Sequence, residues 1–334
     1  MTDKGVLSKE TLHALRFMIA PFFTLILGKL LFELLAFEFP ALHGDLLDSI
    51  AALKQNPQQA ILFSEFRARL LWLTSVIVYL IIYAGFFVLI WQTMRRTLNN
   101  KGLWLYWSIS AFSVLVEIGY LQGIADASSS PLRAIFEFTF NTLTVSGIYS
   151  SSELTAIAAV LDIINLFAFV IAPLTIMTGC SIMQESVDPE IPELHALRLR
   201  SRHLKDLLTG ASAIMVTGII FMKVWLGWPL SFVTDTALQG HLEEITASIA
   251  QYWGITYTLT IVALYLPPAI TLSNQARAVI ITGDDAELKK NPEKWLSENK
   301  LLPSPTAQLP QLIATIAPML VGSFASGIGR TLSF

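Results

Sequence analysis

Four charged side chains interrupt three otherwise apolar stretches of this sequence: Lys29 and Glu33 in the first, Glu117 in the second and Asp162 in the third. A charge inside a membrane span is costly, and such residues are usually paired or lie on the path of an ion. Lys29 and Glu33 are four residues apart, so on a helix they share one face and can form an ion pair. Two roles are open for this pair: a structural contact with a neighbouring helix, or a part in gating or ion passage.

A second set of candidate residues follows one helical stripe. Asp162 and Asn165 are three residues apart, and Phe169 and Pro173 continue the same face. In one interpretation the stripe lines or gates a permeation path. In the other it packs against a neighbouring short helix, and Pro173 only bends its own helix. Glu117 has two roles open: it buttresses the short helix that follows its own span through a hydrogen bond, or it is a buried carboxyl that simply meets a hydroxyl or an amide.

The elements that would position these residues lie within residues 132–183. The apolar run 132–143 gives a helix of about 18 Å, which is short of the roughly 30 Å of a bilayer core. It ends in Thr144, Val145, Ser146 and Gly147, and a polar tip and the long apolar run 154–183 follow. Such a sequence predicts a re-entrant pore loop, because non-helical backbone at membrane depth must be surrounded by protein or water.

This pattern resembles the pore module of the potassium-channel superfamily: outer helix, pore helix, filter and inner helix. The family filter is Thr-Val-Gly-Tyr-Gly, and Thr144 and Val145 match its first two positions. Ser146 stands at the first glycine, and Gly147 and Ile148 stand at the last two positions. The resemblance covers residues 102–184.

The resemblance implies a cation channel built from four copies, because one loop cannot surround an ion. The carbonyls of Thr144 to Gly147, with the Thr144 hydroxyl, would replace the water around a monovalent cation such as K⁺ or Na⁺. The short helix would direct the partial negative charge of its C-terminus toward the cavity. Ser146 and Ile148 replace glycines whose backbone angles side chains disfavour, so we expect a wider and less selective filter.

Composition indicates the class of protein. Hydrophobic residues make up 54% and charged residues 14% of the chain, and the mean hydropathy is +0.59. Soluble domains contain about 25% charged residues. The sequence therefore predicts an all-α integral membrane protein, embedded in a lipid bilayer, with six transmembrane helices and a re-entrant pore helix and loop between the third and fourth. The expected spans are residues 17–37, 70–94, 103–124, 153–183, 207–233 and 245–272.

Basic residues predict the topology. Arg95, Arg96 and Lys101 follow the second span, a basic run at 198–205 follows the fourth, and lysines follow the sixth. The positive-inside rule places these segments and both termini in the cytosol of a plasma or inner membrane. We divide the chain into a two-helix membrane unit with a polar outside loop (1–101), a channel-like pore module (102–184), a charged cytosolic linker (185–206), two further transmembrane helices (207–272) and a cytosolic tail (273–334).

Other functions are also open. Charges at membrane depth and the helix break expected at Pro267-Pro268 favour a secondary transporter. A third hypothesis is a polytopic accessory or signalling protein, whose tail binds a cytosolic regulatory partner. We expect no enzyme, metal, cofactor or nucleic-acid site, since the sequence has no Gly-rich phosphate loop, zinc spacing or nucleophile elbow. Residues 309–332 are apolar, but Pro310, Pro318 and several glycines favour a packed or interfacial segment over a seventh span.

Overall fold

The computed structural model describes residues 9–35, 59–125, 131–184, 193–283, 290–299, 301 and 313–321. Across these residues every regular element is a helix. In chain order they are α1 (Lys9–Leu15), η1 (Arg16–Met18), α2 (Ile19–Leu35), α4 (Gln59–Thr97), α5 (Asn100–Ala125), α6 (Pro131–Ser146), α7 (Ser151–Ile182), α8 (Glu193–Gly227), η2 (Trp228–Phe232), α9 (Thr236–Thr282) and α11 (Pro292–Glu298). A further short helix covers residues 313–321.

Six helical stretches are long and apolar enough to cross a membrane. They are Thr11–Leu34, Ile61–Thr97, Asn100–Gly119, Ser151–Ile182, Glu193–Phe232 and Thr236–Thr282. The all-helical fold and the six candidate spans confirm the coarse prediction from hydropathy. Large apolar side chains also face outward, among them Phe23, Ile81 and Phe112. Extended apolar surface of this kind is typical of a membrane or protein interface, and it fits the length and composition of the six helices.

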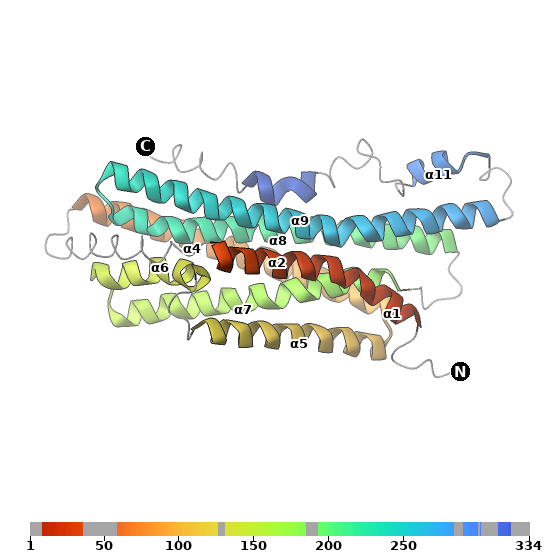
Figure 1. Ribbon diagram of the computed structural model, residues 1–334, viewed down its shortest axis with the longest axis horizontal. Coiled ribbons are helices and arrows are strands. Elements are labelled where there is room, and N and C mark those ends of the chain that lie inside the picture. The colour runs from red at the N-terminus through yellow and green to blue at the C-terminus, as the bar shows by residue number, and fades with distance from the viewer. Residues whose placement is uncertain are drawn as a thin grey trace.

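The helices form one elongated bundle. α8 packs along α9, α4 packs on α8, and α2 packs on α9. α7 joins this group through α4, and α5 lies on the outside, held chiefly by α7 (Figure 1). Aromatic rings fill the interior. The Trp72 ring of α4 lies 5.2 Å from the Trp228 ring of η2, and Tyr83 stacks on Phe167 of α7 at 4.5 Å.

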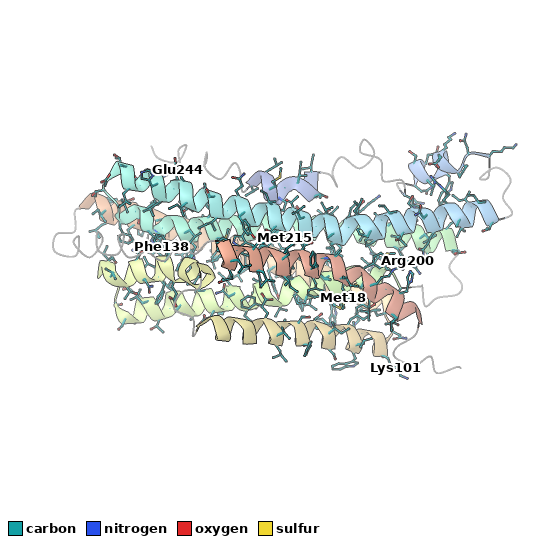
Figure 2. All side chains as sticks on the ribbon, in the orientation of Figure 1. Met18, Lys101, Phe138, Arg200, Met215 and Glu244 are labelled. Atoms are coloured by element: carbon teal, nitrogen blue, oxygen red, sulfur yellow. The ribbon has the colours of Figure 1, made fainter. Side chains whose placement is uncertain are left out.

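The two ends of the bundle differ in charge. Lys101 and Arg200 lie at one end, which is also the end of α1 and α11 (Figures 1 and 2). α4 finishes at this end with Arg95 and Arg96. Phe138 lies toward the opposite end (Figure 2). Basic residues of several helices therefore collect at one end, which we call the basic end.

Several helices continue beyond their apolar spans. α4 begins at Gln59, α8 at Glu193, and α9 continues to Thr282. Much of the expected linker 185–206 is thus the first part of α8, and the first residues of the expected tail are the last turns of α9. The physical reason is that leucine, arginine and lysine are good helix formers whether or not lipid surrounds them.

The turn between α6 and α7 is fixed by local interactions at both helix ends. Gly147 follows α6 with φ 67°, the left-handed conformation with which helices commonly end. Ser150 and Glu153 form a capping box at the start of α7: the Ser150 hydroxyl accepts from the Glu153 N–H, and Glu153 accepts from the Ser150 N–H at 2.8 Å. The result is a short turn between two antiparallel helices.

The short helix at 313–321 lies against α8 and α9. The Ser212 hydroxyl of α8 donates to the carbonyl of Ala314, and the Met319 N–H donates to the Thr258 hydroxyl of α9 at 3.1 Å. Ser212 and Thr258 belong to the apolar parts of their helices. This part of the expected cytosolic tail therefore lies beside two candidate spans, as a packed segment.

Candidate functional site

The residues expected to form a filter occupy a helix end. Thr144, Val145 and Ser146 belong to the last turn of α6, and Gly147 begins the turn after it. The Thr144 hydroxyl donates to the Phe140 carbonyl at 2.9 Å, so it is engaged within its own helix. The Ser146 hydroxyl donates to the Leu143 carbonyl at 2.7 Å. A filter at these residues would therefore be a helix terminus, and not the non-helical pore loop that the sequence predicts. The filter itself stays a prediction.

The turn after α6 is attached to the first part of α4. The Tyr149 hydroxyl donates to the Glu65 carboxylate, which also accepts from Arg69 at 2.7 Å. Glu65 is only 1% exposed, so this carboxylate depends on both partners. The Tyr149 ring packs edge-on against Trp228, 6.2 Å away. The sequence did not predict this cluster; its one local signal is the Glu65–Arg69 spacing of four residues, which lets the two pair on a helix.

α6 also contacts the junction of α8 and η2. The Thr139 hydroxyl of α6 donates to the Trp225 carbonyl at 2.7 Å. Trp225 and Trp228 flank the end of α8, and tryptophans favour the boundary between lipid and water. α6 and the turn after it thus lie at the end of the bundle opposite the basic end.

The strongest candidate site is an ion pair between two spans. The Lys29 ammonium of α2 contacts the Glu117 carboxylate of α5. The side chains are 28% and 22% exposed. The Lys29 nitrogen also lies 5.9 Å from the centre of the Phe169 ring of α7, and Glu117 interacts electrostatically with Tyr257 of α9. Four spans therefore meet at one pair of opposite charges.

Counting along the helices gives the depth of this pair. Lys29 is about 20 Å along the helix axis from Arg16, and Glu117 about 24 Å from Lys101, at 1.5 Å per residue. Arg16 and Lys101 lie toward the basic end, where charges favour the membrane surface. In a hydrocarbon core of roughly 30 Å, the pair would therefore lie well below that surface.

The backbone beside Lys29 is held closely against α9. The Tyr252 hydroxyl donates to the Gly28 carbonyl at 2.6 Å. A Cβ atom at Gly28 would lie 2.5 Å from the Thr256 methyl, so glycine is what lets the helices approach. The Phe32 ring, one turn further along α2, packs 5.3 Å from the Tyr252 ring. These contacts fix the position from which the Lys29 side chain reaches α5.

The other predicted residues are distributed differently. Of the stripe on α7, Phe169 meets Lys29 and Pro173 is buried, while Asp162 is exposed and Asn165 is half-buried. Asp162 precedes Phe169 by about 10 Å along the helix, so the structure separates it from the ion pair. Glu33 lies one turn beyond Lys29 on α2 and is half-buried.

No family model, no curated protein and no solved structure matches this chain. The site is therefore judged on its own chemistry. Across the described residues, no group of three or more histidine, cysteine, aspartate or glutamate side chains could hold a metal ion. Cys180 is buried. The chemistry of this site is that the Glu117 carboxylate holds one positive charge, which in the structure is the Lys29 ammonium.

Proposed function

We propose that this chain is an integral membrane transport protein that moves a monovalent cation or a proton across a bilayer. In this proposal the Glu117 carboxylate binds the transported cation. The Lys29 ammonium competes with that cation for the carboxylate. The observation that carries the proposal is the Lys29–Glu117 pair, within the apolar length of α2 and α5 and in reach of α7 and α9.

The energetics of a charge in a membrane suggest the elementary step. A carboxylate left without a partner in apolar surroundings costs several kcal/mol. Glu117 at this depth is therefore stable only with a positive charge beside it or with a proton on it. The Lys29 ammonium supplies that charge in the structure. A transported cation or proton that reaches Glu117 can take its place, and the exchange between the two is what a carrier requires.

The aromatic ring beside Lys29 gives the displaced ammonium an alternative position. The face of a phenylalanine ring attracts a cation by about 0.5–2 kcal/mol, depending on how far water is excluded. Phe169 lies 5.9 Å from the Lys29 nitrogen. A side-chain rotation of Lys29 therefore releases Glu117 while the ammonium stays within the protein.

The position of α5 would allow this helix to move relative to the rest of the bundle. α5 packs chiefly on α7, at the outside of the bundle, whereas α2 is held firmly on α9 (Figure 1). A shift of α5 along α7 would change the distance between Glu117 and Lys29 while leaving α2 in place. We orient the basic end toward the cytosol of a plasma or inner membrane, as the positive-inside rule favours.

A pore made by four copies is the second candidate. The feature that favours it is α6, a helix of 16 residues that ends at Ser146, just before Gly147, and is too short to span a bilayer. In that arrangement the carbonyls at the end of α6 would surround the ion, and the chain would be a cation channel. Unitary current steps in a planar bilayer, together with a crosslinked tetramer, would favour the pore over the carrier.

The proposal is tested with purified protein in liposomes. Uptake of Na⁺, K⁺ and protons is measured with ion-sensitive dyes under an imposed gradient of each ion. We expect saturable flux of one of these ions in the wild type. Glu117→Gln should reduce it at least ten-fold, because the amide keeps the shape but not the charge. Lys29→Met should change the ion concentration at half-maximal flux, because the competing charge is gone.

Two controls separate transport from folding. Glu244→Gln removes an exposed carboxylate of α9 near its start, away from the pair, and should leave the flux unchanged. The double variant Lys29→Met, Glu117→Gln removes both charges together, and should keep the thermal unfolding temperature close to that of the wild type while abolishing flux. Wild-type protein without flux of any of the three ions, or Glu117→Gln with undiminished flux, would overturn the proposal.

A further inference from the structure

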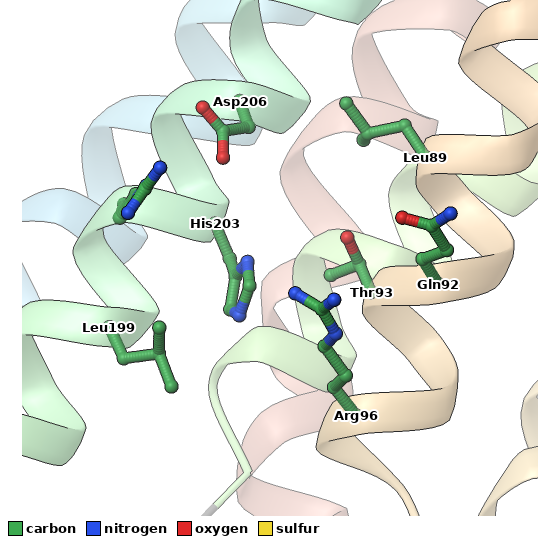
Figure 3. A pocket seen from close by; sticks show the side chains of 8 residues that line it. Leu89, Gln92, Thr93, Arg96, Leu199, His203 and Asp206 are labelled. Carbon is green, nitrogen blue, oxygen red and sulfur yellow. The ribbon is translucent and has the colours of Figure 1, made fainter.

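A cavity of about 230 Å³ lies between α4 and α8 near the basic end. It is formed where the last turns of α4 pass the first turns of α8 (Figure 3). Each helix contributes four side chains. They are Leu89, Gln92, Thr93 and Arg96 from α4, and Leu199, Arg202, His203 and Asp206 from α8. The spacing on each helix places these residues on one face over two turns.

Three polar groups of this cavity have no hydrogen-bond partner among the residues that the structure describes. Across the described residues, neither the Arg96 nor the Arg202 guanidinium has a hydrogen bond or an ion pair. His203 is only 8% exposed, and its buried Nε2 atom meets no hydrogen-bond partner in the described part of the chain. Buried polar atoms in proteins are almost always satisfied, so an orphan of this kind calls for an explanation. Figure 3 shows the His203 ring between Asp206 and Arg96.

The charge of the lining defines the ligand. Two guanidiniums face one carboxylate, that of Asp206, so the cavity has one positive charge in excess when His203 is neutral. Guanidinium groups match the oxygens of phosphate in geometry and in charge. An excess of one charge suits a phosphate that carries a single negative charge, as a diester does. The His203 ring and the Gln92 amide can donate to further oxygens.

The surroundings of the cavity indicate where such a diester comes from. Leu89 and Leu199 form its apolar part, and Val88, next to Leu89, is exposed on the apolar length of α4. The cavity thus has a basic side and a side that continues into the apolar surface of the bundle. Basic pockets between membrane helices at the cytosolic surface are places where anionic lipid headgroups bind.

We propose that this cavity binds the phosphate diester of an anionic phospholipid, held between Arg96 and Arg202. His203 donates to the same phosphate through Nε2, which gives the buried nitrogen its partner. The acyl chains of the lipid lie along the apolar surface of α4. This site is separate from the Lys29–Glu117 pair and does not depend on what the protein transports.

The test is binding to lipid-depleted protein in detergent, followed by native mass spectrometry. Three probes are titrated: phosphatidylglycerol, phosphatidylcholine, and glycerophosphoglycerol, which is the first headgroup without acyl chains. We expect phosphatidylglycerol to bind at least ten-fold more tightly than phosphatidylcholine, whose ammonium the two arginines repel. Glycerophosphoglycerol should bind at least ten-fold more weakly than the intact lipid.

Variants identify the residues that hold the phosphate. Arg96→Gln combined with Arg202→Gln should weaken phosphatidylglycerol binding at least ten-fold, and His203→Phe several-fold. Arg95→Gln is the matched control, since Arg95 is adjacent in sequence but lies over the Trp91 ring, 4.6 Å away. It should bind as the wild type does. Both arginines of the cavity are exposed, so their replacement should leave the fold intact, which the unfolding temperature checks.

Four results would overturn the proposal. Wild-type affinity in the Arg96→Gln, Arg202→Gln variant would show that the lipid binds elsewhere. An equal loss of phosphatidylglycerol affinity in Arg95→Gln would show that any positive charge at this end of the bundle has the same effect. Equal affinity for phosphatidylcholine would exclude an anionic headgroup site. If glycerophosphoglycerol bound as tightly as the intact lipid, the acyl chains would contribute nothing. The ligand would then be a soluble phosphate diester and not a phospholipid.

Discussion

Replacing Gly254 by alanine should loosen the helix at residues 313–321 from α9. A Cβ atom at this position would lie 2.6 Å from the carbonyl oxygen of Pro318 and 3.4 Å from the Cα of Met319. Both are backbone atoms, so no side-chain rotation relieves the contact. The helix has to retreat from α9 as a whole, which puts its other contacts with the bundle at risk.

The size of the effect follows from these distances. A carbon–oxygen contact is comfortable at about 3.3 Å, so the short helix must move by about 0.7 Å. The hydrogen bond from Met319 to Thr258, now 3.1 Å long, would then exceed the range of a real hydrogen bond. Overpacking of this kind costs about 1–3 kcal/mol. The undocked population should therefore rise by about 5- to 150-fold, since 1.4 kcal/mol corresponds to a factor of ten.

Hydrogen exchange measured by mass spectrometry reports this population directly. Amide exchange over residues 313–321 should be faster in Gly254→Ala by the same factor. Gly240→Ala is the matched control, because Gly240 is also in α9 and a Cβ there meets no atom within 4 Å. It should exchange as the wild type does. If Gly254→Ala also exchanged at the wild-type rate, the docking of this helix against α9 would be refuted.

Three further variants test the contacts that hold the spans together, each read as a change in thermal unfolding in detergent. Gly28→Ala brings a Cβ to 2.5 Å from the Thr256 methyl and should destabilise the protein by about 1–3 kcal/mol; an unchanged unfolding temperature would argue against the close α2–α9 approach. Glu65→Leu leaves the Tyr149 hydroxyl and Arg69 without their shared acceptor and should cost about 1–3 kcal/mol, whereas equal stability would mean that the cluster is dispensable. Ser150→Ala removes the capping box of α7 and should cost about 1 kcal/mol, with Ser152→Ala expected to change little.

Hydropathy and charge alone predicted the coarse fold. A span needs about 20 apolar residues in a row, which is a local property of the chain, so the six candidate spans could be predicted from composition. The ends of the helices could not be predicted in this way. α8 continues through the basic run at 198–205, because helix propensity is indifferent to whether lipid or water surrounds the side chains.

The partner of Lys29 shows why the site was harder to predict. Sequence spacing suggested Glu33, because a residue four positions away is the nearest in a helix. In the structure Lys29 contacts Glu117, which is 88 residues further along the chain. Only the packing of α2, α5 and α7 brings them together, and no local pattern encodes that packing. The helical stripe on α7 predicts a role for Phe169 beside Asp162, yet in the structure its ring lies 5.9 Å from the Lys29 nitrogen.

The cavity between α4 and α8 shows the same limitation for residues that are far apart in the sequence. Arg96 and Arg202 were visible in the sequence as members of two basic clusters, and there they indicated topology only. Their neighbours Arg95 and Arg200 carry the same charge but do not line the cavity. Which arginines converge depends on the rotation of α4 and α8 about their axes, and hence on the apolar residues packed between them.

α9 is long enough that a small tilt at its middle displaces its ends by several ångströms. The helix has 47 residues, about 70 Å at 1.5 Å per residue, and it continues through Pro267 and Pro268. Tyr257, beside the ion pair, lies close to its midpoint, and Arg277, near its far end, is ion-paired with Glu293 of α11. A tilt of only 5° about the midpoint would displace that far end by about 3 Å, from the length just given. A small tilt of α9 beside Glu117 would therefore move α11 by a measurable distance.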